Sequence, residues 1–176
     1  MQYRRSYIES GIYFFTVNLN VRNQKLLVEN IQLLRNSFQH IKNKFPFDIN
    51  GIVILPDHIH SIWTLPDNDS EYSKRWRLIK SHFSKHLPKS EQINSSRNNK
   101  GERGIWQRRF WEHQIRDEED YRKHMDYMYF NPVKHGYVCN VIDWPFSSFH
   151  KDVEAGIYSK NWGLREPSEL EVGEVI

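Results

Sequence analysis

The sequence is poor in cysteine and has no long apolar run, and these absences exclude several classes of protein. One cysteine among 176 residues cannot form an internal disulfide, so a secreted scaffold held by disulfides is excluded. No uncharged apolar run approaches the roughly 18 residues that a membrane-spanning helix needs. Arg4 and Arg5 are not followed by the apolar block of a signal peptide, so we expect a cytoplasmic protein with no membrane partner.

What remains is the composition of a globular domain with an uneven distribution of charge. Hydrophobic residues make up 38% and charged residues 27% of the chain, which argues against disorder. The net charge is only +3, yet residues 72–116 hold twelve Lys or Arg against three acids. Such an excess is typical of a surface that binds phosphates, although a solvated helix face and loop give the same pattern.

Hydrophobic periodicity predicts four strands and three helices. Strands are expected at residues 11–19, 47–55, 58–65 and 105–115, and the nearly all-apolar second one is expected at the centre of the sheet. Helices are expected at residues 27–45, 76–87 and 117–130, each ended by a proline, and residues 88–104 are expected to form a mobile loop. The order β-α-β-β-α-β predicts an α+β fold of the ferredoxin-like, split βαβ type. Its antiparallel sheet carries packed helices and is followed by a C-terminal helix.

The triplet His58-Ile59-His60 lies at the start of the third expected strand. Side chains alternate between the two faces of a strand, so both imidazoles point one way and Ile59 points the other way. Two neutral imidazoles on one face can bind a divalent cation. Two hydrogen-bonded histidines at a strand end, with no metal, would have the same pattern.

The third expected helix has a polar face. Residues at steps of four and three share this face: Asp120, His124, Tyr127 and Asn131. A second, more apolar face holds Tyr121, Met125 and Met128. Core-facing helices usually keep polar groups off their buried side, so a phenol amid polar residues suggests a site. Asn131 can add a carbonyl oxygen to the two histidine nitrogens. A rim tyrosine with no catalytic role is the alternative for Tyr127.

Three stretches of the sequence resemble one family. The first is LPDHIHSIWTLP, which resembles the HUH motif (His-hydrophobe-His) of single-tyrosine transposases. The others are RRFWEHQIRDEEDYRKHMDYMYFNPVKHGYV and DWPFSSFH, which are similar to the REP-associated tyrosine transposases of bacteria. The resemblance extends over residues 3–163.

The resemblance implies a site and an activity. His58 and His60 match the metal ligands, and Tyr127 matches the nucleophile. Asn131 stands where related transposases have a glutamine as third ligand. The family implies cutting of single-stranded DNA at hairpin-forming, REP-like repeats, with Mg²⁺ or Mn²⁺. It also implies an HUH transposase-like catalytic domain at residues 1–150, a tail at residues 151–176, a monomer or homodimer, and a place near the bacterial nucleoid.

The chemistry agrees with these residue types. A phenol has a pKa near 10 and is a weak nucleophile at neutral pH, so a divalent cation that polarises the scissile phosphate helps it. In-line attack gives a 5′-phosphotyrosine and a free 3′-OH, and reversal by another 3′-OH joins strands without ATP.

The candidates for DNA contact are basic or aromatic. They are Tyr3, Arg4, Arg5, Lys74, Arg75, Arg77, Lys80, Arg108 and Arg109. Two other functions fit the same fold. One is a non-catalytic protein that binds single-stranded DNA or RNA, which needs neither the histidines nor the tyrosine. The other is a metal-dependent hydrolase, which needs the histidines alone.

Overall fold

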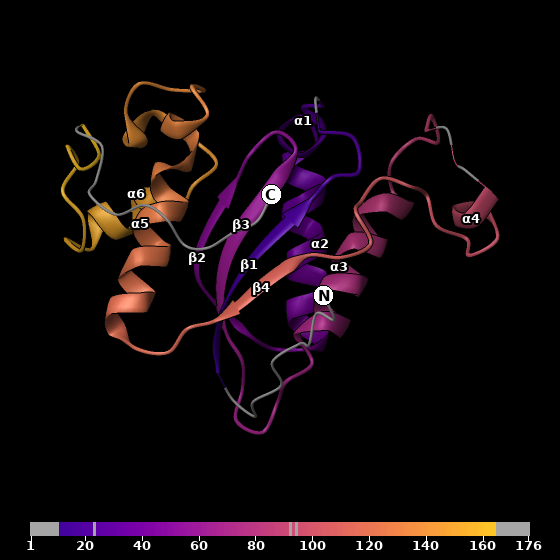
Figure 1. The fold of residues 1–176 in the computed structure, drawn as a ribbon, viewed down its shortest axis with the longest axis horizontal. Coiled ribbons are helices and arrows are strands. Elements are labelled where there is room, and N and C mark those ends of the chain that lie inside the picture. Colours follow the sequence, from indigo (N-terminus) through magenta and orange to yellow (C-terminus); the bar gives the residue numbers. More distant parts are fainter. Residues whose placement is uncertain (1–10, 23, 92, 94, 165–176) are drawn as a thin grey trace, which may run out of the picture.

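A four-stranded antiparallel sheet organises the fold (Figure 1). The computed structural model describes residues 11–22, 24–91, 93 and 95–164. The strands are β1 (Ile12–Asn18), β2 (Asp48–Ile54), β3 (His58–Thr64) and β4 (Trp111–Gln114), in the order β2-β3-β1-β4. Each neighbouring pair is antiparallel, which confirms the predicted α+β, ferredoxin-like fold. Within the described ranges, no helix is both long enough and apolar enough to cross a membrane.

Two long helices cover one face of the sheet. They are α2 (Ile31–Lys44) and α3 (Tyr72–Lys85), preceded by the short α1 (Leu26–Glu29). Alternate residues of β1, such as Tyr13 and Phe15, point into this layer and are fully buried there. The rings of Trp63 and Trp76 stack 4.3 Å apart and join β3 to α3. The aromatic residues of this half therefore build the core.

The other face is covered by α5 (Glu118–Lys134), with the short α6 (Phe149–Glu154) beyond it (Figure 1). Phe14 and Ile62 of the sheet pack here with Met125 and Met128 of the helix. Gly51 of β2 lies directly beneath these methionines, where a Cβ would be 2.5 Å from Cε of Met128. The apolar face predicted for the third helix thus packs against β2.

The position of β2 corrects one prediction. The apolar strand was expected at the centre of the sheet, but β2 is an edge strand. Its free edge is covered by the segment after the turn η1 (Val141–Asp143). Ile54 N–H donates to the Phe146 carbonyl at 2.9 Å, and Ser148 N–H donates to the Ile52 carbonyl at 2.9 Å. This cover lies over the second half of β2, where Val53 and Ile54 are buried, so the apolar sequence there resembles that of a central strand.

Several element boundaries also differ from the sequence prediction. The expected helix 27–45 is divided at Asn30, whose side chain donates to the Leu26 carbonyl at 2.9 Å. The expected loop 88–104 contains a single helical turn, α4 (Ser95–Asn98). The last strand is regular only over four residues, and its earlier part pairs with the chain at the end of β1 through the Leu19–Trp106 bridge.

The third helix continues past the proline that was expected to end it. Pro132 lies inside α5, which runs to Lys134. A proline removes one N–H from a helix, but the N–H of His135 still donates to the Asn131 carbonyl at 3.0 Å. Asn131 and Pro132 are both buried, and this packing holds the last turn together.

The described part of the expected tail packs on the rest of the chain. α6 crosses the expected boundary at residue 150. The rings of Tyr158 and Trp162 lie 5.5 and 5.9 Å from that of Phe149. Trp144 and Phe149 are buried, so the DWPFSSFH stretch packs this end of the chain on the fold.

Candidate active site

β3 places His58 and His60 on one face of the sheet, as the alternation predicts. Ile59 packs into the core on the opposite face. The two imidazole rings are 4.9 Å apart between centroids, and the residues are only 3% and 1% exposed. His58 is paired with Asn18, the last residue of β1, so the histidines lie at one end of the two central strands.

Each imidazole is held at Nδ1 by a neighbour that the sequence analysis did not assign to the site. Nδ1 of His58 lies 2.6 Å from Oδ1 of Asp57, and Nε of Arg22 donates to Oδ2 of the same carboxylate at 2.8 Å. Burial acts to raise the pKa of Asp57, but the hydrogen bonds from His58 and Arg22 outweigh it and lower the pKa. Nδ1 of His60 lies 2.9 Å from Oγ1 of Thr16. This arrangement is common at metal sites, where a second partner at Nδ1 directs Nε2 toward the ion.

α5 brings Tyr127 and Asn131 to these histidines, and the predicted polar face of the helix is confirmed as a buried face. The ring of Tyr127 lies 5.4 Å from that of His60. Phe14 of β1 contacts both rings, at 6.1 and 5.6 Å between centroids. Among the residues that the structure describes, Nε2 of His60 and both polar atoms of the Asn131 amide are buried without a hydrogen-bond partner.

These unpartnered atoms fit a divalent cation. Burial and the neighbouring His58 lower the pKa of His60, which keeps the ring neutral, while the nearby Asn131 amide opposes this shift in part. A neutral imidazole nitrogen and a carboxamide oxygen are both good ligands for a divalent ion. Leaving such atoms buried and unpaired costs free energy, so a cation here would stabilise the fold.

The other two tyrosines of α5 face away from the histidines. The Tyr129 hydroxyl donates to Oδ2 of Asp152 at 2.6 Å, and burial raises the pKa of this phenol. Burial also raises the pKa of Tyr121, with Asp152 adding to the shift. Of the three tyrosines, Tyr127 is the one whose ring lies against a histidine of β3.

Two further residues at the end of α5 lie at this site. Nζ of Lys134 is 5.1 Å from the centroid of the Tyr127 ring. The His135 ring is 5.3 Å from that of His58. The signal in the sequence was spacing, since Lys134 follows Tyr127 by seven residues, about two helical turns. A helix that ended before Asn131, as Pro132 predicted, would not have included Lys134.

A second cluster of possible ligands lies near the start of α5. His113 of β4 meets Asp120 and His124 of the helix, and one ligand atom from each lies within 4.8 Å of the others. Nε2 of His113 is 2.8 Å from Oδ2 of Asp120, and Nδ1 of His124 is 3.2 Å from Oδ1. This His/Asp cluster is close enough to hold a cation.

The basic residues proposed to contact DNA lie in different surroundings. Arg75 is 2% exposed, and its guanidinium pairs with Asp69 and donates to the carbonyls of Phe45 and Pro46. These contacts leave Arg75 no access to a phosphate, so it is a structural residue. Tyr3, Arg4 and Arg5 lie outside the described residues. Arg77 and Arg109 are exposed on the surface.

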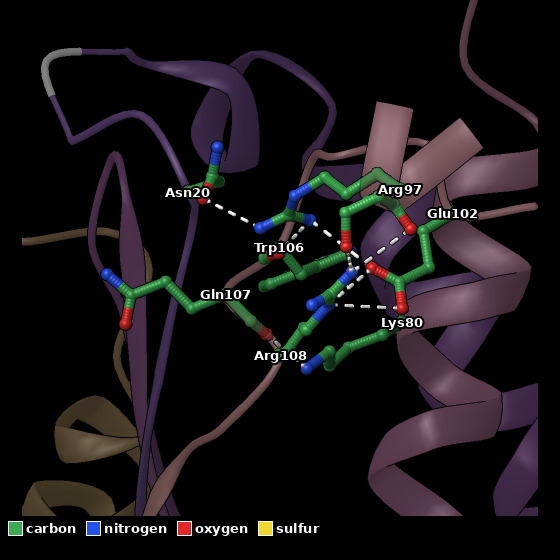
Figure 2. A network of polar contacts seen from close by, with 8 residues as sticks. Asn20, Lys80, Arg97, Glu102, Trp106, Gln107 and Arg108 are labelled. Carbon is green, nitrogen blue, oxygen red and sulfur yellow. Dashed lines mark hydrogen bonds and ion pairs between the residues drawn. The ribbon is translucent and has the colours of Figure 1, made fainter. Parts of the chain in front are cut away.

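Lys80 and Arg108 belong to a polar network between α3 and the segment before β4 (Figure 2). Lys80 donates to the Gln107 carbonyl at 2.7 Å, and Arg108 pairs with Glu102 at 2.9 Å. Arg97 donates to Oδ1 of Asn20 at 2.9 Å, just beyond the end of β1. The network lines a surface pocket of about 670 Å³ with seven basic residues and one acid: Lys74, Arg77, Lys80, Lys85, Arg97, Arg103, Arg108 and Glu102. We call it the basic pocket.

Known proteins share both the sequence and the fold. A scan against protein-family models finds no match. The chain is 47% identical over 175 residues to the "REP-associated tyrosine transposase" of Escherichia coli (strain K12), covering 99% of this chain and 98% of that protein. It is 49% identical over 162 residues to the "Putative REP-associated tyrosine transposase" of Haemophilus influenzae, covering 92% of each.

A solved structure is also similar over the full length. It is described as the structure of a REP-associated tyrosine transposase bound to a REP hairpin, and it has a TM-score of 0.81 and 46% sequence identity. The similarity covers 100% of this chain and 99% of that one. The chain therefore belongs to the REP-associated tyrosine transposases, enzymes that nick and join DNA.

Proposed function

We propose that this protein nicks and rejoins single-stranded DNA beside REP-type hairpins through a 5′-phosphotyrosine at Tyr127. The observation that supports it most is the convergence of Tyr127 and Asn131 from α5 on His60 of β3, around buried polar atoms without partners. The REP hairpin bound in the similar structure, at 46% identity, supports the same class of DNA.

In the proposed reaction, Tyr127 breaks one DNA strand and holds its 5′ end. The phenolic oxygen attacks the scissile phosphorus and gives up its proton, a P–O bond to Tyr127 forms, and the P–O3′ bond breaks. The leaving 3′ oxygen takes up a proton and becomes a free 3′-OH. Lys134, whose Nζ lies over the Tyr127 ring at 5.1 Å from its centroid, offers positive charge near the phenol that loses its proton. Attack by another 3′-OH reverses these steps and joins two strands.

His58, His60 and Asn131 are the residues that would hold a Mg²⁺ or Mn²⁺ ion. Such an ion supplies Lewis-acid polarisation of the phosphate. Asp57 and Thr16 fix the two imidazoles through their Nδ1 atoms, at 2.6 and 2.9 Å. This support keeps the rings in place when DNA enters.

The basic pocket supports a path for the DNA. Arg97, which lines it, donates to Asn20 just beyond β1, and His58 is paired with Asn18 at the end of the same strand. The pocket, on the α3 side of the sheet, and the histidines, on the α5 side, thus both reach the end of β1. We propose that Lys74, Arg77, Lys80, Arg108 and the exposed Arg109 contact phosphates of the hairpin while its single-stranded flank reaches Tyr127. The enzyme would act on chromosomal repeats in the bacterial cytoplasm.

The test is a search for protein-linked DNA. The protein is incubated with Mg²⁺ and a labelled REP hairpin that carries single-stranded flanks, then denatured and separated by electrophoresis. A labelled band at the mass of the protein plus DNA, mapped to Tyr127 by mass spectrometry, is expected. A fully duplex oligonucleotide of equal length is the control and gives no band. Binding with no adduct and no cleavage would instead favour a non-catalytic DNA-binding protein, and cleavage without adduct would favour a hydrolase.

A further inference from the structure

The stretch FWEHQIRDEED forms one hydrogen-bonded cluster around Asp120, and the proposed reaction assigns it no role. Nε2 of His113, on β4, lies 2.8 Å from Oδ2 of Asp120. The backbone N–H of Arg116 donates to the same oxygen at 3.0 Å, and its Nε does so at 3.2 Å. The Asp120 N–H in turn donates to Oδ1 of Asp117, the N-cap of α5, at 2.8 Å.

We infer that Asp120 is a positioning residue for the nucleophile. With His113 and His124, it fixes the first turn of α5 against the edge strand β4 and thereby sets where Tyr127 lies over His60. The inference rests on the proposed function, because it concerns the placement of Tyr127.

The connection from Asp120 to Tyr127 has two parts. The first is the helix itself, since His124 and Tyr127 follow Asp120 by four and seven residues on one face. His124 Nδ1 donates to the Asp120 carbonyl at 2.8 Å and stacks on His113, with ring centroids 4.4 Å apart. The second is Phe14 of β1, whose ring lies 4.9 Å from that of His124 and 6.1 Å from that of Tyr127. Displacement of the first turn would therefore move both the helix and the ring that packs against Tyr127.

The charge of the cluster supports this role. Burial acts to raise the pKa of Asp120, but the hydrogen bonds from His113 and Arg116 outweigh it and lower the pKa to about 2. The carboxylate is therefore ionised at all working pH values and can accept all three donors.

A metal ion is the competing occupant of this cluster. The three possible ligands are within 4.8 Å of one another. However, the carboxylate already accepts from the Arg116 guanidinium, and the two imidazole rings are nearly parallel, at 13°. Two stacked rings direct their nitrogen lone pairs in parallel planes rather than at one point, so the observations favour hydrogen bonding over metal binding.

The effect expected from loss of the cluster is kinetic. Asp120→Asn keeps the size of the side chain but turns an NH₂ toward the donors that the carboxylate accepted. A shift of about 1 Å in a reacting group can slow a reaction on the order of 100-fold, so adduct formation at saturating DNA should fall by about 10- to 100-fold. The Kd for the hairpin should stay the same, because Asp120 is 7% exposed and lies on the α5 side of the sheet, away from the basic pocket.

A matched control on the same helix separates positioning from simple stability. Asp126 accepts a hydrogen bond from the Tyr158 hydroxyl at 2.6 Å, on the face of α5 that looks away from β4. Asp126→Asn makes the same chemical change and should leave the rate of adduct formation within about twofold of wild type. A second pair of variants tests His113, the hydrogen-bond partner of Asp120. His113→Gln keeps an N–H donor and should retain most of the rate of adduct formation, whereas His113→Leu should lose it.

The experiment measures single-turnover adduct formation, hairpin Kd and Tm for each variant. Slow adduct formation with unchanged Kd in Asp120→Asn and His113→Leu, but not in Asp126→Asn or His113→Gln, supports the inference. An unchanged rate in folded Asp120→Asn, or an equal loss in Asp126→Asn, overturns it. The inference is also overturned if the His58→Ala, His60→Ala double variant binds one equivalent of Zn²⁺ and the further change Asp120→Asn abolishes that binding. Failure of the wild type to form an adduct at Tyr127 would refute the proposed function instead.

Discussion

Two tyrosines that are two residues apart on α5 are expected to respond in opposite ways to loss of the hydroxyl. They lie about 200° apart around the helix, so Tyr127 faces His60 and Tyr129 faces α6. Tyr127→Phe should abolish adduct formation and leave hairpin binding intact, because no other group replaces the nucleophile. Tyr129→Phe should keep the activity and lower the stability of the fold.

The stability change follows from the hydrogen bonds of each phenol. The Tyr129 hydroxyl donates to Asp152 at 2.6 Å and lies 3.0 Å from Oγ of Ser148, and all three groups are at least half-buried. Removing it leaves a buried carboxylate without this donor, which costs about 1–3 kcal/mol. At roughly 2–4 °C per kcal/mol for a chain of this size, Tm should fall by several degrees. Tyr127→Phe keeps the buried ring and should cost no more than about 1–2 kcal/mol.

The assay combines thermal unfolding with detection of covalent DNA. Each variant is melted with and without hairpin, then incubated with labelled hairpin and Mg²⁺ and separated under denaturing conditions. The assignment of Tyr127 as nucleophile is refuted if Tyr127→Phe still forms an adduct, or if the wild-type adduct maps to Tyr129 or Tyr121. It is also refuted if Tyr129→Phe is inactive while its Tm equals that of the wild type.

Three other outcomes are expected. His58→Ala with His60→Ala should abolish cleavage and Mn²⁺ binding, measured by calorimetry, while the fold is kept; a double variant that cuts normally contradicts the ligand assignment. Arg77→Ala should weaken hairpin binding and reduce the slope of log K against log salt by about one, whereas the buried Arg75→Ala should lower Tm instead. Hairpin binding by the wild type that does not change with salt would argue against the basic pocket as the DNA surface. Burial lowers the pKa of His60 and His124, so below about pH 6.5 the unfolded chain binds protons that the folded chain does not. The free energy of unfolding should therefore fall as pH drops from 6.5 to 5.5, and a Tm that is constant over this range contradicts the argument.

Local periodicity was enough to predict the arrangement of the fold. The alternation around His58 and His60 gave both the strand and the shared face, and the steps of three and four gave the face of Tyr127. Local periodicity could not predict that β2 is an edge strand, because the segment that covers this strand contains Phe146 and Ser148, more than 90 residues away. A strand buried by a distant segment has the same sequence as one buried between two neighbours.

The supporting residues of the site were harder to predict than the central ones. The family resemblance grouped His58 and His60 with Tyr127, whereas Thr16 reaches His60 from another strand, 44 residues away. Arg75 looked like its neighbours on a basic helix, because its pairing with Asp69 depends on how the preceding loop folds back. Charge counts treat every arginine alike, and only tertiary contacts separate the buried from the exposed ones.

The buried environment of His58 and His60 is formed by β3 and α5, which are translated at different times. β3 is complete at Thr64, whereas the helix that covers its histidines ends only at Lys134. During synthesis, at about 5–20 residues per second, the pair of imidazoles is therefore exposed for several seconds before Tyr127 can reach it. A chain released in that interval would keep both histidines but lack Tyr127 and Asn131, so it would hold only part of the proposed site. Competence for strand cleavage thus comes late, with one of the last helices to be translated.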